Sequence, residues 1–432
     1  MTHHRVSIAP ARRLAGVLQP VIPEIGELVH RTPGTLSLAQ GMVSWGPPLG
    51  VMEALQTALA PQPSGSAGAP SFTDPSRDTY GPVRGDPVLL AALASSLEQH
   101  HGIDLDGADL WVTAGSNMAF NAIAQVLCAG PPAEPSEVIL PLPYYFNHVM
   151  AVQLAGGRPV AVDAGLVPDP QRLAAAITPR TRAIVTVSPN NPSGVVMPRS
   201  VLEAINGLCA SHGLVHISDE AYGQFVYGAE PHWSPGSLPG AAAHTVTLQS
   251  LSKAYGMAGW RVGFMAAPSG LGAALAKVQD TVLICPPRLM QRAAVAALAA
   301  GPAWCRPRIA ELAGRRRQLL KAVADAQSEG LHVRLLAEPS GAFYGLLALE
   351  PTPAAGGLTS DVLMRRLVLE HRVAAVSGES FGLAAADPAA GGQGPTLRLS
   401  YGLLNADDLQ EALRRLFGGI RALLAAPHPN GP

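Results

Sequence analysis

Apolar residues follow two spacings along most of the chain. Seven short runs rich in Val, Ile and Leu have the length and composition of buried strands. They are DLWVTAG (109–115), EVILPLP (137–143), RPVAVDA (158–164), AIVTVSP (183–189), LVHISDE (214–220), HTVTLQS (244–250) and RVGFMAA (261–267). Stretches with apolar residues three or four positions apart, such as 200–212, lie between most of these runs and are typical of helices. The alternation predicts an α/β fold in which a mainly parallel, mixed sheet lies between helices.

The segments outside these strands predict how the chain is divided. A helical pattern at 17–29 and the turn-rich LAQGMVSWGPP (38–48) precede a Gly/Pro/Ser-rich loop at 61–76. A helical region at 288–327 leads to a smaller α+β domain with the expected strands GAFYGLLAL (341–349), HRVAAVSG (371–378) and TLRLSYG (396–402). The predicted organisation is an N-terminal arm that contributes to the small domain (1–50), a large domain (51–295), a connecting helix (296–330), a small C-terminal domain (331–425) and a tail (426–432).

The composition is that of a folded protein without a strongly charged surface. The chain has 432 residues, of which 48% are hydrophobic and 14% charged, with a formal net charge of −1. It can therefore bury a sizeable core, and it lacks the basic excess that nucleic acids or anionic membranes attract. The four cysteines are scattered without a C-x-x-C pair, and no apolar run approaches the roughly 20 residues that span a bilayer. We expect a cytoplasmic protein that binds neither nucleic acid nor membrane and holds no structural metal.

The segment SLSKAYGMAGWR (250–261) combines a lysine with several groups that bind anions. It lies between two apolar strands, so Lys253 is expected in a site apolar enough to lower its pKa, where it could form a Schiff base with an aldehyde. Ser250, Ser252 and Arg261 could together hold a phosphate ester. Each residue alone would be typical of a solvated loop, and only the combination indicates a site.

Three other polar segments follow predicted strands, where parallel sheets bind their ligands. In Asp219-Glu220-Ala221-Tyr222 the aspartate is expected either to cap the next helix or to pair with a buried cation. Asn190-Asn191-Pro192-Ser193-Gly194 is by itself a turn signal. Gly115-Ser116-Asn117 precedes a helical pattern and is typical of a helix start, whose free N–H groups also attract phosphate.

These segments, in this order, resemble the fold-type I enzymes that use pyridoxal 5′-phosphate (PLP), and specifically the class I/II aminotransferase family. The resemblance extends over about residues 20–420 and implies that the large domain binds PLP. In that family the S-x-S-K block carries the lysine that holds the cofactor, which implies Lys253. Ser250, Ser252 and Arg261 are then implied as phosphate ligands.

The resemblance also assigns roles to the residues that follow two further strands. Asp219 matches the partner of the pyridine nitrogen, whose positive charge makes the ring an electron sink for a carbanion at the substrate Cα. Tyr222 matches a donor to the phenolic oxygen. Asn191 matches a second donor to that oxygen, which also touches the substrate carboxylate.

Five more residues match positions around the cofactor. Gly115, Ser116 and Asn117 match the cup that holds the phosphate. Tyr145 best matches the aromatic ring over the pyridine face, although a core tyrosine is an alternative. Tyr80 matches a tyrosine that reaches the phosphate of the neighbouring subunit, which implies a homodimer with shared active sites.

A single arginine lies in the alternating strand LRLSY (397–401), where its neighbours are expected to be buried. Its guanidinium therefore needs an anion, either an internal carboxylate or a ligand. The resemblance implies that Arg398 holds the substrate α-carboxylate, helped by a backbone N–H near Gly41.

Substrate side-chain specificity depends on one hypothesis. In relatives selective for acidic substrates the partner subunit delivers an arginine near the segment VQDT (278–281), where this chain has Asp280. Asp280 would disfavour aspartate or glutamate as donors and favour cationic or polar ones, although an exposed helix position explains it equally well. Without that arginine the chain resembles the glutamine/kynurenine-type and other broad aminotransferases more closely. The run Arg315-Arg316-Arg317 lies in a helical pattern, and we expect a solvated face there.

The predicted function is amino transfer from an L-amino acid to a 2-oxo acid through a Schiff base on Lys253, with the freed lysine moving the Cα proton. The same residues would serve a β-lyase, a cyclising synthase or an oxidase, which stay open as alternatives. A PLP-binding transcription regulator is a weaker alternative. Such proteins carry an N-terminal helix-turn-helix domain, and only about 30 residues precede the first family motif here.

Overall fold

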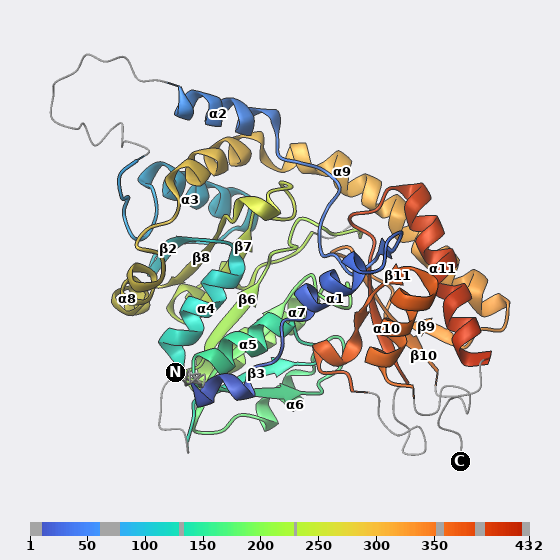
Figure 1. The fold of residues 1–432 in the computed structure, drawn as a ribbon. Coiled ribbons are helices and arrows are strands. Elements are labelled where there is room, and N and C mark those ends of the chain that lie inside the picture. Colours follow the sequence, from blue (N-terminus) through green and yellow to red (C-terminus); the bar gives the residue numbers. More distant parts are fainter. Residues whose placement is uncertain are drawn as a thin grey trace, which may run out of the picture.

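The computed structural model describes residues 11–60, 78–128, 134–228, 231–350, 358–384 and 394–425. The predicted loop at 61–76 and the predicted tail at 426–432 lie outside the described residues. Within them, a larger and a smaller sheet are joined by one long helix (Figure 1).

Seven strands form one mixed sheet in the larger part of the molecule, in the order β2-β8-β7-β6-β5-β3-β4. They are β2 (Ala108–Thr113), β3 (Glu137–Pro141), β4 (Arg158–Val162), β5 (Thr181–Val187), β6 (Val215–Asp219), β7 (Thr245–Ser250) and β8 (Gly263–Pro268). β8 runs antiparallel to both of its neighbours, and the other pairs are parallel. Each of the seven predicted runs forms one of these strands, so the mainly parallel sheet is confirmed.

Helices cover both faces of this sheet, because strand side chains alternate between two cores. Val138 and Leu140 of β3 pack in a cluster with Phe120, whereas Ile139 packs in another cluster with Ile205. Burial on both faces explains why the inner strands are rich in apolar residues, whereas β4 at the edge of the sheet is only partly buried. The helices of this part are α2 (Leu49–Leu59), α3 (Pro87–His101), α4 (Ser116–Leu127), α5 (Phe146–Leu154), α6 (Pro170–Ala175), α7 (Arg199–His212) and α8 (Gly272–Leu283).

Helix ends follow local sequence signals. α3 begins after Asp86, whose side chain accepts a hydrogen bond from a backbone N–H of the first turn, and it ends at Gly102, which has a left-handed φ of 64°. The helix predicted at 17–29 begins later, as α1 (Val21–His30). Pro20 precedes it with an extended backbone. Proline has no backbone N–H to donate to a helical hydrogen bond, which favours a helix that begins after it.

The long helix α9 (Arg288–Ser328) matches the helical region predicted at 288–327 and links the two sheets. Gly301 interrupts it with φ 64° and ψ −178°, so two helical segments meet at a kink. The first segment packs beside α2 and α3, and the second beside α11 (Ala406–Ala425) (Figure 1).

The three consecutive arginines of α9 occupy three environments. Arg317 is exposed, as predicted, but only 5% of Arg315 is exposed. Arg316 is half-buried and donates a hydrogen bond to the carbonyl oxygen of Pro339. The prediction of a solvated face is therefore wrong for Arg315, because neighbouring side chains on a helix with 3.6 residues per turn point in different directions.

A four-stranded antiparallel sheet forms the smaller part, in the order β12-β13-β10-β9. Its elements are β9 (Val333–Leu335), β10 (Tyr344–Leu349), α10 (Ser360–His371), β12 (Val376–Ser377), β13 (Thr396–Ser400) and α11. β1 (Leu36–Ser37) pairs in parallel with β11 (Val373–Ala374), so the N-terminal segment packs on the smaller part. Two of the three expected strands are present as β10 and β13. The third, expected at 371–378, is divided into β11, which pairs with β1, and β12, and β9 is a strand that the sequence did not indicate.

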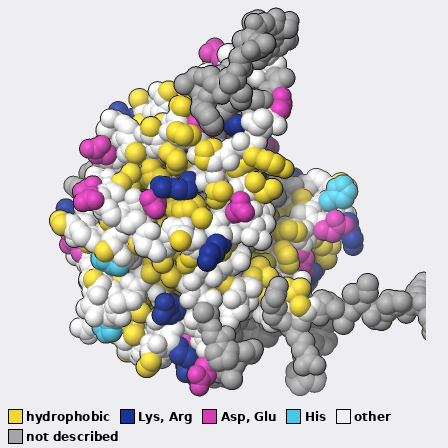
Figure 2. Space-filling view, turned by 90° about the vertical axis from the view of Figure 1, so that its left-hand side faces the viewer, with side chains coloured by type: hydrophobic (Ala, Val, Ile, Leu, Met, Phe, Trp, Pro, Cys, Tyr) yellow, Lys and Arg dark blue, Asp and Glu magenta, His cyan; other side chains and the backbone are white. Residues whose placement is uncertain are grey.

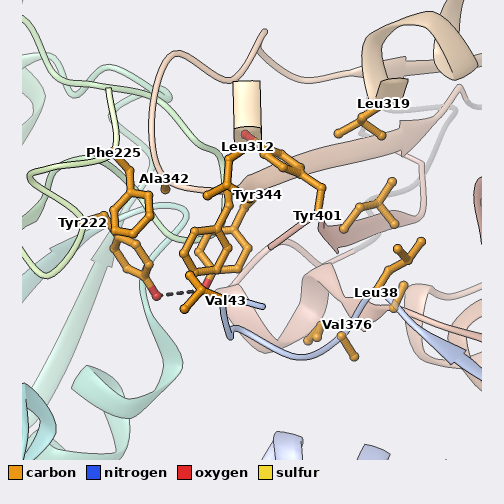
Figure 3. Close-up of a cluster of buried hydrophobic side chains, with 14 of the residues drawn as sticks. Leu38, Val43, Tyr222, Phe225, Leu312, Leu319, Ala342, Tyr344, Val376 and Tyr401 are labelled. Atoms are coloured by element: carbon orange, nitrogen blue, oxygen red, sulfur yellow. Dashed lines mark hydrogen bonds between the residues drawn. The ribbon is translucent and has the colours of Figure 1, made fainter. Parts of the chain in front are cut away.

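A continuous apolar core joins the two parts (Figure 3). Tyr222 and Phe225, which follow β6, pack edge-on against Phe343, at centroid distances of 5.5 and 5.3 Å. Leu312 of α9 and Leu38 of the N-terminal segment are fully buried in the same cluster. The residues after β6 are thus held in place by the smaller part of the molecule.

Among the described residues, no single helix has the length and apolar composition of a membrane span. The segments Ser269–Leu283 and Arg288–Ser328 pass that test only when taken together, and they are bent by 118°.

Candidate active site

Loops at the carboxyl ends of the parallel strands surround one polar cavity. It is lined by Ser116, Asn117, Tyr145, Val187, Asn191, Asp219, Ala221, Tyr222, Ser250, Ser252, Lys253 and Arg261. All of these except Val187 and Ala221 are residues that the sequence predicted. The register of the sheet explains part of this assembly, since Val187 at the end of β5 lies opposite Asp219 at the end of β6.

Lys253 projects into this cavity from the loop after β7. Its Nζ atom donates a hydrogen bond of 2.6 Å to the carbonyl oxygen of Gly41. Burial, with the positive charges of Arg398 and Arg261, lowers the pKa of Lys253 to about 8. A substantial fraction of the amine is therefore neutral near physiological pH, as a nucleophile requires. Gly41, predicted for its backbone N–H, meets Lys253 through its carbonyl group.

Asp219 is a buried carboxylate with two partners. Its Oδ2 atom lies 3.1 Å from Nε2 of His148, and its Oδ1 atom accepts a hydrogen bond of 3.1 Å from the backbone N–H of Ala221. His148 is itself buried and stacks on Phe120 at a centroid distance of 4.0 Å. The pairing stabilises a carboxylate that would otherwise be costly to bury. Asp219 therefore presents negative charge to the cavity.

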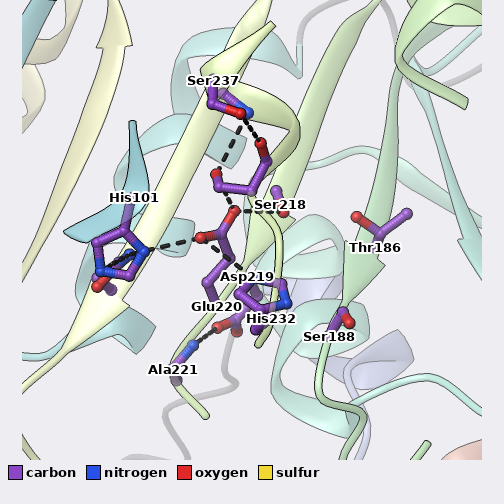
Figure 4. A network of polar contacts seen from close by, with 12 residues as sticks. His101, Thr186, Ser188, Ser218, Asp219, Glu220, Ala221, His232 and Ser237 are labelled. Carbon is purple, nitrogen blue, oxygen red and sulfur yellow. Dashed lines mark hydrogen bonds and ion pairs between the residues drawn. The ribbon is translucent and has the colours of Figure 1, made fainter. Parts of the chain in front are cut away.

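Glu220 follows Asp219 directly but points away from it, into a separate polar cluster (Figure 4). Its carboxylate accepts hydrogen bonds from Ser218 Oγ (2.9 Å) and Ser234 Oγ (2.6 Å) and lies 3.3 Å from His232 Nε2. Burial would raise the pKa of Glu220, but the hydrogen bond and charge of His232 lower it below its usual value. This cluster supports the end of β6, while Asp219 faces the cavity.

The opposite end of the cavity is suited to an anion. α4 begins at Ser116, so its first backbone N–H groups and the positive end of its dipole lie at the cavity. Arg261 has a left-handed φ of 55°, and its guanidinium donates to the carbonyl oxygens of Ala258 (2.8 Å) and Ala114 (3.1 Å). A side chain at Gly115, where φ is 84°, would overlap this guanidinium. Glycine is therefore required for Arg261 to reach the start of α4.

Two serines lie beside this anion site. Ser250 Oγ accepts a hydrogen bond of 3.1 Å from the backbone N–H of Ser252, and Ser252 is buried. Both line the cavity, as the S-x-S-K block predicts.

Two tyrosines present neutral hydroxyl groups to the cavity. The Tyr222 hydroxyl lies 2.7 Å from that of Tyr344, and burial raises the pKa of Tyr222 well above its usual value. Burial also raises the pKa of Tyr145, whose hydroxyl accepts a hydrogen bond of 2.8 Å from Asn147 Nδ2. Both phenols stay protonated at neutral pH and can donate or accept hydrogen bonds.

Arg398 lies on β13 with 2% of its surface exposed. It donates one hydrogen bond of 3.1 Å to Asn191 Oδ1 and another to the carbonyl oxygen of Ala39, and its Nε atom has no partner among the described residues. Within the part of the chain that the structure describes, its acceptors are the Asn191 side chain and the Ala39 carbonyl group, and no carboxylate pairs with it. The internal salt bridge considered from the sequence is therefore not found there, and the guanidinium is available to an anionic ligand.

Five predicted residues are not among those that line this cavity. Three of them contact lining residues, since Gly41 accepts a hydrogen bond from Lys253, Gly115 lies against Arg261, and Arg398 donates to Asn191. The other two are Tyr80 and Asp280. Tyr80 is 79% exposed, and Asp280 is exposed on α8. Neither lines the cavity of a single subunit.

The sequence did not single out three residues of the site. Only its polarity within an apolar helical segment distinguishes His148 in the sequence. Tyr344 and the carbonyl group of Ala39 resemble ordinary core positions. Their roles come from contacts between distant segments, which a local pattern does not contain.

Comparison with known proteins identifies the family of this chain. The model of the family described as aminotransferase class I and II matches residues 36–416. The chain belongs to this family. An arginine–pyruvate transaminase from Pseudomonas aeruginosa is 36% identical over 342 residues, which are 78% of this chain and 81% of that protein. An aromatic aminotransferase from Arabidopsis thaliana is 31% identical over 425 residues, 96% of this chain and 97% of that protein.

A solved structure agrees with this assignment. The aspartate aminotransferase of Thermus thermophilus with maleate has a TM-score of 0.80 at 29% identity, over 96% of this chain and 100% of its own. The predicted fold-type I architecture and the predicted enzyme class are thereby confirmed. The chain is an aminotransferase with an amino acid and a 2-oxo acid as its class of substrates.

Proposed function

We propose that this aminotransferase carries out PLP-dependent amino transfer in the cavity around Lys253. The observation that supports it most strongly is a buried lysine of lowered pKa in the same cavity as the buried carboxylate Asp219 and the anion site at Arg261. A β-lyase, a cyclising synthase or an oxidase would use a similar site. The relatives named above are transaminases, which favours amino transfer.

The residues present fit PLP at both of its ends. The cradle that needs glycine at position 115 would take the phosphate, together with Ser116, Asn117, Ser250, Ser252 and Arg261. Asp219 would pair with the pyridine nitrogen, Tyr222 and Asn191 would donate to the phenolic oxygen, and Tyr145 would cover the ring. When bound, PLP supplies an aldehyde and a ring that accepts the negative charge developed at the substrate Cα.

The substrate would lie between Lys253 and Arg398. The Arg398 guanidinium, paired with Asn191 and without an acidic partner among the described residues, would bind the α-carboxylate of the donor and then of the acceptor. Lys253 would take the Cα proton as a base and return a proton as an acid, which its lowered pKa permits. The hydrogen bond from Lys253 to Gly41 keeps the amine near this position.

A spectral screen tests the proposal. The purified protein is mixed with PLP and then with single L-amino acids, and absorbance reports conversion to pyridoxamine phosphate. We expect stoichiometric conversion by the true donor, recovery of PLP on adding a 2-oxo acid, and labelling of Lys253 by borohydride. Lys253→Ala should abolish all three. Release of ammonia or pyruvate without conversion would instead indicate a lyase, and a protein that leaves PLP unbound would contradict the proposal.

We also propose a homodimer in which Tyr80 completes the site of the partner subunit. Tyr80 is exposed, but its segment is held by Arg288, which donates a hydrogen bond of 3.0 Å to Thr79 Oγ1. α2, α3 and α8 carry further exposed apolar side chains, among them Leu49 (82%) and Val88 (64%). Figure 2, which views the side of the molecule where α8 lies, shows broad apolar areas between scattered charges. A second copy would cover such a surface.

Subunit hybrids test this arrangement. In a mixture of Lys253→Ala and Tyr80→Ala chains, each hybrid dimer would contain one site with both residues intact. We expect its activity at limiting PLP to exceed the sum of the two separate variants. Activities that merely add would contradict a shared site.

For the donor we propose a cationic or polar amino acid rather than an acidic one, because Asp280 would repel a second carboxylate. This role requires a partner subunit to bring Asp280 to the site, since it is exposed in a single chain. Asp280→Ala should raise kcat/KM for glutamate relative to arginine, by roughly tenfold if the two charges approach closely. An unchanged ratio would show that Asp280 is only a surface residue.

We further propose that residues 51–295 form the PLP-binding domain and 331–425 the small domain, with 1–50 as an arm and 296–330 as the connection. A cytoplasmic location is proposed on the composition alone.

A further inference from the structure

Arg315 is a buried charge for which the proposed reaction has no use. It lies in the second segment of α9, and its side chain is 6% exposed. Arg317, two positions along the same helix, is exposed. A buried guanidinium requires partners and is costly without them.

The partners of Arg315 come from three parts of the chain. Its Nη1 atom donates a hydrogen bond of 2.9 Å to the carbonyl oxygen of Gly402, in the turn after β13. Its Nη2 atom donates one of 3.0 Å to Ser44 Oγ, in the N-terminal segment, and also pairs with Glu311 of α9. One planar group therefore joins α9, the N-terminal segment and the end of β13.

The segment 38–45, which contains Ser44, accepts hydrogen bonds from both Lys253 and Arg398. The carbonyl oxygen of Gly41 accepts the hydrogen bond from Lys253, and that of Ala39 accepts one from Arg398. We call residues 38–45 the arm segment. Its position decides where two acceptor oxygens lie relative to the amine and to the guanidinium.

The arm segment is also packed directly against the turn that Arg315 binds. Gly402 lies so close to the carbonyl oxygen of Met42 that a side chain there would overlap it. The backbone N–H of Ser400 donates a hydrogen bond of 2.7 Å to the carbonyl oxygen of Leu38. Arg315 therefore links the arm segment to the turn at Gly402, and these two backbone segments meet beside Arg398.

We propose that Arg315 is a positioning residue of the substrate-carboxylate site, acting through the arm segment and the turn at Gly402. The inference rests on the proposed function, because it assumes that Arg398 binds the carboxylate of the substrate. Arg315 does not touch the substrate itself. Its loss lets the arm segment move, and with it the carbonyl groups that orient Arg398 and Lys253.

The test compares Arg315→Met with Arg317→Met, the same change at an exposed position of the same helix, and with the milder Ser44→Ala. We expect Arg315→Met to raise KM for both the amino acid and the 2-oxo acid by about tenfold, as the loss of hydrogen bonds to a charged group suggests. kcat should fall less, because the interaction is made in the ground state as well. Ser44→Ala should shift KM in the same direction by a smaller factor, and Arg317→Met should leave it unchanged.

A second readout needs neither cofactor nor activity. In the PLP-free protein, amide hydrogen exchange of the arm segment should become about tenfold faster in Arg315→Met, with β5 and β6 unchanged. Exchange that rises uniformly, or KM values equal to those of Arg317→Met, would overturn the proposal. If the wild-type chain binds no PLP or converts no amino acid, the proposed function fails, whereas a normal wild type with an unaffected Arg315→Met removes only this inference.

Discussion

The two sides of the cavity are built in different ways. On the sheet side, Asp219 is the last residue of β6, Lys253 follows β7 and Arg261 precedes β8, and hydrogen-bonded neighbouring strands set their spacing. On the arm side, Arg398 meets the carbonyl oxygen of Ala39 across 359 residues of sequence. Hydrogen bonds between neighbouring strands therefore position the residues of the sheet side. A few hydrogen bonds from charged side chains to distant backbone segments position those of the arm side. Changes on the two sides should therefore have different kinetic signatures.

The largest effect is expected on the sheet side, from Asp219→Ala. Removing the carboxylate removes the charge proposed to keep the cofactor ring an electron sink, so kcat should fall by about 10²- to 10³-fold, as for other electrostatic groups at reacting centres. KM should change little. Steady-state kinetics at saturating PLP measure this. Asp219→Asn, which keeps the size and loses the charge, should behave in the same way. A variant with normal kcat would contradict the proposed role of the sheet side in the chemical step.

A smaller effect is expected on the arm side, from Arg398→Lys. Lysine keeps the charge but cannot bind Asn191, Ala39 and a carboxylate with one planar group, so kcat/KM should fall by roughly 10²-fold. The loss should appear mainly in KM for both substrates. Equal losses in kcat for Arg398→Lys and Asp219→Ala would show that the two sides do not differ.

A third effect, of comparable size, concerns stability and pH. The folded chain prefers neutral Lys253, with a pKa of about 8, whereas the unfolded chain keeps the proton up to about 10.5. Lys253 therefore destabilises the PLP-free protein fully below pH 8, and the destabilisation disappears as the pH rises towards 10.5, a difference of about 3 kcal/mol. Denaturant unfolding should show Lys253→Met to be more stable than the wild type at pH 7, by an amount that shrinks at pH 10. A constant difference would contradict the lowered pKa.

The sheet side was accessible from the sequence because its residues follow apolar runs directly. Strand ends after 183–187 and 214–218 lie side by side in any parallel sheet of this order, so Asn191 and Asp219 were expected together. The seven strands were likewise predictable, since burial on both faces makes the inner ones rich in apolar residues. The strand β9, with three residues, is too short to give such a pattern.

The arm side was less accessible, for a physical reason. Nothing near Ala39 in the sequence indicates that its carbonyl oxygen accepts a hydrogen bond from Arg398, 359 positions away. Arg315 looked like part of a solvated face because its charge, taken alone, favours water. Which arginine of a run is buried depends on the helix face that packs inward, and that face is set by segments such as 38–45 that are remote in sequence.

The break at Gly301 has a consequence for the geometry of the whole molecule. Because α9 is two rods and not one, the angle between its halves depends on the backbone around Gly301. Gly301 has a φ of 64°, which residues other than glycine rarely adopt, and Pro302 after it has no backbone N–H to donate. The first rod is anchored beside α3 and the second beside α11. The relative placement of the two sheets is therefore tied both to the backbone torsion angles of Gly301, which lies in neither sheet, and to the apolar core that joins the two parts.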